Sequence, residues 1–176
     1  IPCRIAVNRF RPSRSQRRCL QINVDCSTHR VRADYRDEHF QLYRRYIHAR
    51  HARGNMANPL PRDYKNFLYS DWSDTFFLEF RENGQLLAVT VCDQIKSGLS
   101  AVYSYFNPDM ASRGLGTYCV LKMIEQADRL GLDYLYLGYL IHDSGKMRYK
   151  QNFRPLEVYI DNQWRDHLGS DSGTSL

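Results

Sequence analysis

The sequence has no long hydrophobic run and no recognisable leader. None of its apolar stretches approaches the roughly 20 residues of a membrane-spanning helix. The first residues also lack the basic, apolar and small-residue order of a signal peptide. These absences predict a cytoplasmic protein that has no membrane partner.

The cysteines are few, and none are spaced for a zinc site. There are five, an odd number, and no two are separated by the two to four residues typical of metal-binding pairs. Two stand inside apolar periodic segments, as reduced core thiols do. The sequence therefore predicts no metal site. The five positions are Cys3, Cys19, Cys26, Cys92 and Cys119.

Acidic residues are absent from the first eighteen positions, which hold six arginines. The whole chain has a net charge of +6 and a sequence pI of about 9.1. Guanidinium groups bind phosphates in a bidentate manner, so this stretch fits contact with phosphate or RNA. A solvated basic surface explains the same composition, and both interpretations stay open.

Linkers long enough to separate domains are absent as well. The 176 residues are 43% hydrophobic, which is enough for one domain with a substantial core. The last eight residues are rich in Ser and Gly, as frayed chain ends are. We therefore predict a single domain over residues 1–168 and a flexible tail over residues 169–176.

The stretch from residue 99 to residue 139 has the clearest secondary-structure pattern in the sequence. It reads as a strand over 99–106, a loop over 107–114, a helix over 115–130 and a strand over 134–138. Gly114 and Gly116 stand where the helix begins, so backbone N–H groups can come close to a ligand there. Because the positive end of the helix dipole also lies there, the stretch predicts a site for a phosphate-like group.

The remaining patterns predict an α/β (α+β) domain with a mixed, mostly antiparallel sheet and flanking helices. Ser13 and Gln16 form a capping box that starts a helix. Asn83 and Gly84 form a hairpin turn. The other predicted elements are strands over 3–10, 75–81, 85–95 and 156–160, and helices over 36–52 and 63–69.

Three features have both a structural and a functional interpretation. Cations alternate with aromatic residues over 146–154, which fits either a single-stranded nucleic-acid end or a basic helix that packs its rings. Asp93 stands near a strand end, either as a turn residue or facing a cleft. His51 falls at a helix end, where a surface histidine is common.

Six ordered motifs are specific as a set, although no single one is. They occupy residues 11–18, 43–46 with 50–51, 88–93, 100–103, 115–118, and 136–139 followed by 146–155. Together they resemble the arginyl-tRNA–protein transferase family, and more closely its bacterial branch, the aspartate/glutamate leucyltransferases. The order of strands, glycine turn and helix also resembles the GNAT acyltransferase fold.

The resemblance implies an activity and its partners. It implies transfer of leucine, or arginine, from aminoacyl-tRNA to the α-amine of proteins that begin with Asp or Glu, which marks them for N-degron degradation. The family's cysteine-rich region, linked to an iron–sulfur cluster, is missing here except for Cys3. No cofactor is therefore expected in this chain, although a cluster is expected in a full-length protein.

Two other function classes stay open. One is a GNAT N-acetyltransferase that uses acetyl-CoA, although Arg113 directly before Gly114 departs from the usual GNAT turn. The other is a non-enzymatic RNA-binding module, which explains the arginines and leaves the glycine turn without a purpose.

We predict three groups of site residues for the transferase. The residues predicted to hold the tRNA end are Arg14, Arg17, Arg18, Tyr103, Tyr105, Gly114, Gly116 and Thr117. The residues predicted to bind the acidic acceptor are His51, Lys146, Arg148 and Lys150. The predicted catalytic residues are Asp93 and Glu157 for the amine proton and Tyr149 for the oxyanion.

Overall fold

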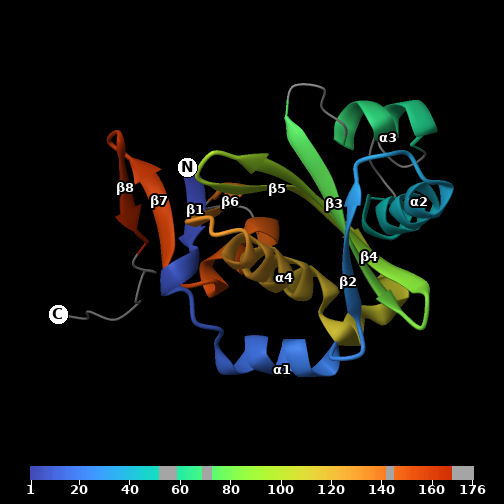
Figure 1. Ribbon diagram of the computed structural model, residues 1–176, viewed down its shortest axis with the longest axis horizontal. Helices are drawn as coiled ribbons and strands as arrows, with labels where there is room; N and C mark the ends of the chain where they lie inside the picture. The colour runs from blue at the N-terminus through green and yellow to red at the C-terminus, as the bar shows by residue number, and fades with distance from the viewer. Residues whose placement is uncertain (52–58, 69–72, 142–144, 168–176) are drawn as a thin grey trace.

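The structure is a computed structural model that describes residues 1–51, 59–68, 73–141 and 145–167, without side-chain detail for His51 and residues 145–148. The strands in these ranges form one eight-stranded sheet in the order β2-β3-β4-β5-β6-β1-β7-β8 (Figure 1). The strands are β1 (Pro2–Ala6), β2 (Ser27–Arg32), β3 (Asp74–Glu82), β4 (Gln85–Ile95), β5 (Gly98–Phe106), β6 (Tyr134–Tyr139), β7 (Leu156–Ile160) and β8 (Gln163–Asp166).

Four α-helices and three 3₁₀ helices lie within the described ranges. The α-helices are α1 (Arg14–Ile22), α2 (Asp37–His51), α3 (Pro61–Leu68) and α4 (Leu115–Arg129). The 3₁₀ helices are η1 (Val7–Arg9), η2 (Pro108–Arg113) and η3 (Gly145–Asn152). The predicted mixed α/β class, with its mostly antiparallel sheet and flanking helices, is confirmed.

Short sequence patterns predicted most helix and strand boundaries to within two residues of the observed ones. The capping box of Ser13 and Gln16 starts α1, and Asn83 and Gly84 turn β3 into β4. The strand predicted over 3–10 is wrong in its second half, because it ends at Ala6. The N–H of Val7 then donates to the carbonyl of Asp133, and η1 follows. β2 and β8 were not predicted.

The sheet is buried on both faces along its first half. Successive residues of β3 alternate between two clusters: Phe76 and Leu78 face α4, whereas Phe77 faces α2 and α3. Figure 1 shows α4 and α1 together, apart from α2 and α3. Because both faces are covered, β3 and β4 read as nearly continuous apolar runs rather than as alternating ones.

β5 and β6 meet over a short distance and then separate. They are parallel, and their pairing covers only residues 98–100 and 134–136. Gly98 makes this close approach possible, since a Cβ there would lie 2.3 Å from the carbonyl oxygen of Tyr134. Beyond Ser100 the facing edges of the two strands no longer pair with each other. We call the opening between them the splay.

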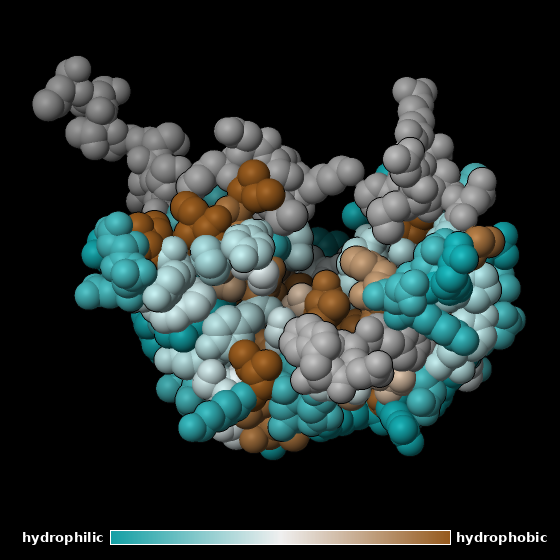
Figure 2. All heavy atoms as spheres, turned by 90° about the horizontal axis from the view of Figure 1, so that it is seen from above, coloured by the Kyte–Doolittle hydropathy of each residue, from teal (hydrophilic) through white to brown (hydrophobic). Residues whose placement is uncertain are grey.

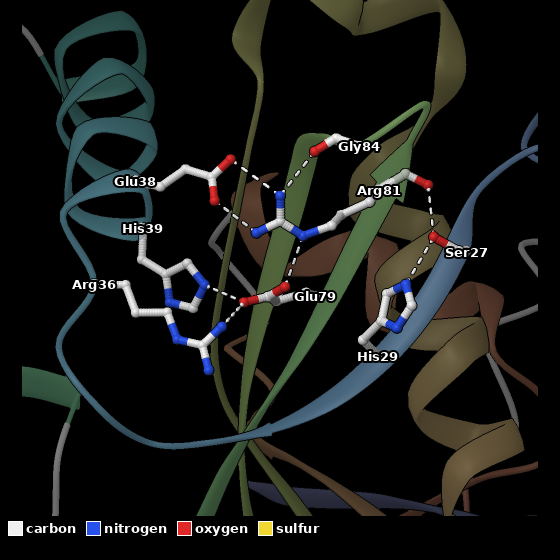
Figure 3. Close-up of polar contacts among 8 residues, drawn as sticks. All are labelled: Ser27, His29, Arg36, Glu38, His39, Glu79, Arg81 and Gly84. Carbon is white, nitrogen blue, oxygen red and sulfur yellow. Dashed lines mark hydrogen bonds and ion pairs between the residues drawn. The ribbon is translucent and has the colours of Figure 1, made fainter.

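A buried histidine–glutamate pair joins α2 to β3 (Figure 3). The Nε2 of His39 lies 2.7 Å from Glu79 Oε1, and both residues are buried. Arg36 and Arg81 each donate to the same carboxylate at 2.7 Å, and Arg81 also binds Glu38. The Nδ1 of His39 has no hydrogen-bond partner among the described residues, which fits a neutral ring whose proton is on Nε2.

This pair predicts acid sensitivity. Burial lowers the pKa of His39 below its ordinary 6.5, so only the unfolded chain takes up that proton as the pH falls below about 7. Burial alone would raise the pKa of Glu79, but hydrogen bonds from Arg81 and His39 bring it below its ordinary value. The contribution of Glu79 is therefore present above about pH 4.5 and is lost as the pH falls through its lowered pKa.

We expect His39→Gln to flatten the decline in unfolding free energy between pH 7.5 and pH 5.5, because glutamine can donate to Glu79 without titrating. Urea unfolding at each pH measures this. His29 is exposed and bonded to Ser27, so His29→Gln should follow the parent protein. Equal pH slopes for His39→Gln and the parent would contradict the assignment.

Candidate functional site

Helix α4 begins without the side-chain cap that closes the start of α1. At α1, Ser13 Oγ accepts the N–H of Gln16, and the Gln16 side chain accepts the N–H of Ser13. At α4 the N-cap is Gly114, in the left-handed region at φ 61° and ψ 38°, and no side chain caps the helix. The first N–H groups of α4 therefore have no intrahelical partner and carry the positive end of its dipole. They can bind an anion.

Arg113, directly before this turn, holds the turn in place. Its Nε donates to Asn23 Oδ1 at 2.9 Å, and its guanidinium also binds Glu82 at 2.7 Å. The buried Asn23 in turn donates from Nδ2 to the carbonyl of Arg113 at 2.8 Å. Because Asn23 follows α1 directly, these bonds fix the end of α1 against the start of α4.

A pocket of about 200 Å³ lies where α1, the start of α4 and the end of η3 meet. A water molecule takes about 30 Å³ in the liquid, so the pocket has room for a phosphate group. Gln16 Nε2 donates to the carbonyl of Asn152 at 2.9 Å and joins α1 to η3 beside it. The hydroxyls, cations and glycine in its lining are those of Ser15, Ser112, Thr117, Arg18, Arg113 and Gly114.

Three of the residues predicted to hold the tRNA end thus meet at one pocket: Arg18, Gly114 and Thr117. Arg14 and Arg17 are exposed on α1, and Arg17 donates to the carbonyl of Pro12 at 2.6 Å. Gly116, which is also predicted to hold the tRNA end, lies against Phe106: a Cβ on Gly116 would lie 3.3 Å from that ring.

A larger cavity of about 520 Å³ lies between η1, α1 and α4, and its chemistry does not suit a phosphate. Its walls are mostly apolar. Its charged lining is two carboxylates, Glu125 and Asp128, and one guanidinium, Arg11, whereas the smaller pocket has two guanidinium groups and no carboxylate. The smaller pocket is therefore the candidate anion site.

The splay opens along β5 from Ser100 towards the end of that strand, where Phe106 lies against Gly116 of α4. A bulge leaves Val102 opposite no residue of β4, since Val91 pairs with Tyr103 and Cys92 with Ala101. Figure 2 shows a hollow at the centre of the face seen from above, with hydrophobic residues on its visible floor. The hollow lies between the end of the molecule that carries β7 and β8 and the end that carries α2 and α3.

The two tyrosines of β5 have different surroundings. Tyr105 is completely buried, and its hydroxyl lies 2.7 Å from that of Tyr64, so the prediction that it flanks an adenosine is wrong. Tyr103 is half-buried, and its ring centroid lies 5.2 Å from that of Phe67, which is 47% exposed. The stacking role of Tyr103 stays a prediction.

Sequence reasoning missed Arg50 as a site residue. Its guanidinium carbon lies 5.4 Å from the ring centroid of Tyr46 and 5.1 Å from that of Phe106. The signal in the sequence was the spacing of four between Tyr46 and Arg50 on one helix, which places both on one face. Phe106 could not be found in this way, because the contact depends on how α2 crosses β5.

Lys150 is a buried cation in η3. It is 5% exposed, and its Nζ donates to the carbonyl of Tyr139 at 2.6 Å. Burial lowers its pKa, and no carboxylate forms an ion pair with it in the ranges that the structure describes. A buried ammonium without a counter-ion is costly, so a ligand carboxylate would improve its environment. Its role in acceptor binding stays a prediction.

Tyr149, the neighbour of Lys150, has the chemistry of a hydrogen-bond donor. Its side chain is 43% exposed, yet desolvation of its hydroxyl raises its pKa. Cys3 and Tyr46, from β1 and α2, add to this increase electrostatically. The phenol therefore keeps its proton at neutral pH, as a donor to an oxyanion must.

The two predicted carboxylates lie in different parts of the sheet. Glu157 Oε2 accepts from Arg4 at 2.7 Å and Oε1 accepts from Arg9 at 3.2 Å, so both carboxylate oxygens are already paired, and its role with the amine proton stays a prediction. Asp93 accepts hydrogen bonds from Ser73 and Thr75, and it pairs across the strands with Ser100, where the splay begins. Its catalytic role stays a prediction.

Other predicted residues lie outside what the structure describes. These are the side chains of His51, Lys146 and Arg148, and the tail over 169–176. Within the described residues, no group of three or more His, Cys, Asp or Glu side chains is arranged to hold a metal. In the same ranges no helix is long and apolar enough to cross a membrane.

Sequence comparison gives a consistent picture. The family described as arginine-tRNA-protein transferase, C terminus, matches residues 38–160. An aspartate/glutamate leucyltransferase from Nitrosococcus oceani is 50% identical over 164 residues, which cover 93% of this chain and 69% of that protein. Proteins of the same name from Alkalilimnicola ehrlichii and Alcanivorax borkumensis are 48% and 45% identical; they cover 92% and 98% of this chain, which in turn covers 68% and 72% of them.

Solved structures share the fold at low sequence identity. The C-terminal domain of a lysylphosphatidylglycerol synthetase from Agrobacterium fabrum aligns with a TM-score of 0.58 and 14% identity, covering 78% of this chain and 45% of that one. A structure described as L-PGS from Bacillus licheniformis aligns with a TM-score of 0.57 and 10% identity. The alignment covers 82% of this chain and 47% of that one. These two similarities concern the fold alone.

Proposed function

Because this chain belongs to the arginine-tRNA-protein transferase family, we propose that it moves leucine from leucyl-tRNA to the α-amine of proteins that begin with Asp or Glu. The observation that carries this proposal is the 50% identity, over 93% of the chain, to an aspartate/glutamate leucyltransferase. Arginyl-tRNA is the alternative donor. The product would enter N-degron degradation in the cytoplasm, and a full-length protein would add an iron–sulfur region.

The pocket at the start of α4 supports this proposal on the donor side. The terminal phosphate of the tRNA would bind the uncapped N–H groups and the hydroxyl of Thr117, with Arg18 beside it. Arg14, one turn earlier on α1 and exposed, would meet the preceding phosphate. The bonds between Arg113 and Asn23 keep these groups at a fixed spacing before the substrate arrives.

The splay is the natural meeting point of ester and amine in a GNAT-like fold, which we propose for this domain. Beyond Ser100 the edge of β5 that faces β6 has no strand partner in the described residues, so backbone groups are left unpaired there. An extended acceptor chain could bind such groups, as peptides do at open strand edges. Tyr149, whose ring contacts Phe153 at a centroid distance of 6.5 Å, would have to reach this opening to act there.

The chemistry requires little activation. The amine nitrogen attacks the ester carbonyl carbon, the bond from that carbon to the ribose oxygen breaks, and an amide and a free ribose hydroxyl result. An α-amine has a reference pKa of about 7.7–8.0, so a useful fraction is neutral at pH 7. Lys150 would hold the first acidic side chain, and Tyr149 would donate to the oxyanion. Asp93 and Glu157 are the candidates for the amine proton. Positioning supplies most of the acceleration.

An acetyl-CoA N-acetyltransferase is the competing enzyme class, and an RNA-binding module without activity is the non-enzymatic one. Arg113 argues against the acetyltransferase, because its guanidinium binds Asn23 and Glu82 within the protein. Thermal stabilisation by CoA, with none by tRNA, would favour acetyl transfer. Stabilisation by tRNA without any transfer would favour a binding module.

A transfer assay tests the proposal. Labelled leucyl-tRNA and arginyl-tRNA are offered with peptides that differ only in residue one: Asp, Glu, Asn or Lys. We expect leucine on the Asp and Glu peptides and little on the other two. Transfer of acetyl from acetyl-CoA, or equal transfer to the Asn and Asp peptides, would overturn the proposal.

A further inference from the structure

Arg50, near the end of α2, places its planar guanidinium against two aromatic rings, which we call the aromatic step. Its guanidinium lies over the rings of Tyr46 and Phe106, whose centroids are 4.9 Å apart. Tyr46 is 7% exposed, whereas Arg50 is exposed. The guanidinium therefore lies against two protein rings, and the exposed part of it is open to a planar ligand.

The other arginines of α2 differ from Arg50 in their partners. Arg45 forms an ion pair with Asp109 at 2.7 Å, and Arg44 lies 5.8 Å from the ring centroid of Phe40 and donates to Gln41. No carboxylate among the described residues forms an ion pair with Arg50. Arg50 thus keeps its charge and the exposed part of its guanidinium available.

Phe106 connects this step to the anion site. The same ring that lies beneath Arg50 is 3.3 Å from where a Cβ would stand on Gly116, the second residue of α4. The start of α4 and the guanidinium therefore both lie beside the same phenylalanine. A nucleotide has the matching shape, because its phosphate and its base are about one ribose apart.

We propose that the base of the tRNA's 3′-terminal nucleotide stacks on the exposed guanidinium of Arg50 while its phosphate binds the start of α4. This inference rests on the proposed function and relocates the base from Tyr105, which is buried, to Arg50 on the aromatic step. Bases stack on arginine planes as well as on aromatic rings. The ribose then lies at the end of β5, so the ester points into the splay.

The test uses binding without chemistry. An uncharged RNA minihelix carries 2-aminopurine as its last nucleotide, and its fluorescence is quenched when that base stacks. We expect the parent protein to quench it. Arg50→Ala should lose the quenching and raise the Kd about 10-fold, as loss of one stacked base does. Arg50→Lys keeps the charge without the plane, and we expect it to lose the quenching too.

Arg44→Ala is the matched control, since it removes the same charge from the same helix away from Phe106. We expect its Kd within about 3-fold of the parent, with full quenching. Parent-like quenching by Arg50→Lys, or equal losses for Arg44→Ala and Arg50→Ala, would overturn the proposal in favour of general charge attraction. Melting temperatures confirm that each variant is folded. Quenching without any leucine transfer would overturn the proposed function and leave this inference standing.

Discussion

Thr117→Asp is expected to raise the KM for leucyl-tRNA about 30-fold or more while leaving the protein as stable as before. Thr117 is the third residue of α4 and lines the anion pocket. A carboxylate in the first turn of a helix stabilises it by about 0.3–1 kcal/mol. The same carboxylate faces the incoming phosphate, and like charges in contact cost several kcal/mol, of which about 2 kcal/mol already corresponds to 30-fold.

Thr117→Asn has nearly the same shape as the aspartate variant and no charge, so it is the control. Its KM should stay within about 3-fold of the parent, because the side-chain amide of asparagine can donate to the phosphate in place of the threonine hydroxyl. Steady-state transfer kinetics and thermal unfolding measure the two quantities. If Thr117→Asp and Thr117→Asn have the same KM, the phosphate does not bind at the start of α4.

Lys150→Met is expected to lower kcat/KM for peptides that begin with Asp by about 100-fold without lowering the melting temperature. Lys150 is 5% exposed, and the carbonyl of Tyr139 is the acceptor that the structure gives its ammonium. Methionine fills similar space and removes a buried charge, whose desolvation costs several kcal/mol. Loss of one partner from a buried, bonded charge pair in the complex costs about 2–5 kcal/mol, so activity and stability should respond differently.

Lys96→Met is the matched surface change, in the exposed turn between β4 and β5. It should leave both the transfer rate and the melting temperature unchanged. A Lys150→Met protein with parent-like kcat/KM would show that the acidic acceptor binds elsewhere. A variant that fails to fold would equally contradict the expectation, because the burial cost would then not have been the dominant effect of the ammonium.

Elements with strong local signals could be predicted from the sequence. Ser13 with Gln16 and Asn83 with Gly84 each determine a boundary through bonds or dihedral angles within a few residues. β2 and β8 could not be found, because they are edge strands whose residues are mostly exposed. Neither has a buried face to impose a strict apolar alternation, and their pairing depends on β3 and β7, which lie elsewhere in the sequence.

The residues of the candidate site likewise fall into those with a local sequence pattern and those whose surroundings depend on distant parts of the chain. The position of Gly114 and Thr117 at the start of α4 could be predicted because a glycine turn before an amphipathic helix is a local pattern. The role of Tyr105 was wrong because its partner is distant in sequence: Tyr64 contacts its hydroxyl in the core. The ion pair of Glu157 with Arg4, 153 residues earlier, could not be predicted for the same reason. Burial and pairing of this kind arise only when the chain closes, so residue type alone could not distinguish them from free groups.

The position of β1 has a consequence for how the chain folds during synthesis. β1 lies between β6 and β7, and Arg4 is paired with Tyr136, 132 residues later. At about 5–20 residues per second, the ribosome needs on the order of ten seconds to add those residues. For that time the apolar side chains of Cys3 and Ile5 have no strand beside them. The nascent chain therefore carries an unsatisfied hydrophobic segment that a chaperone can occupy until β6 and β7 emerge from the exit tunnel.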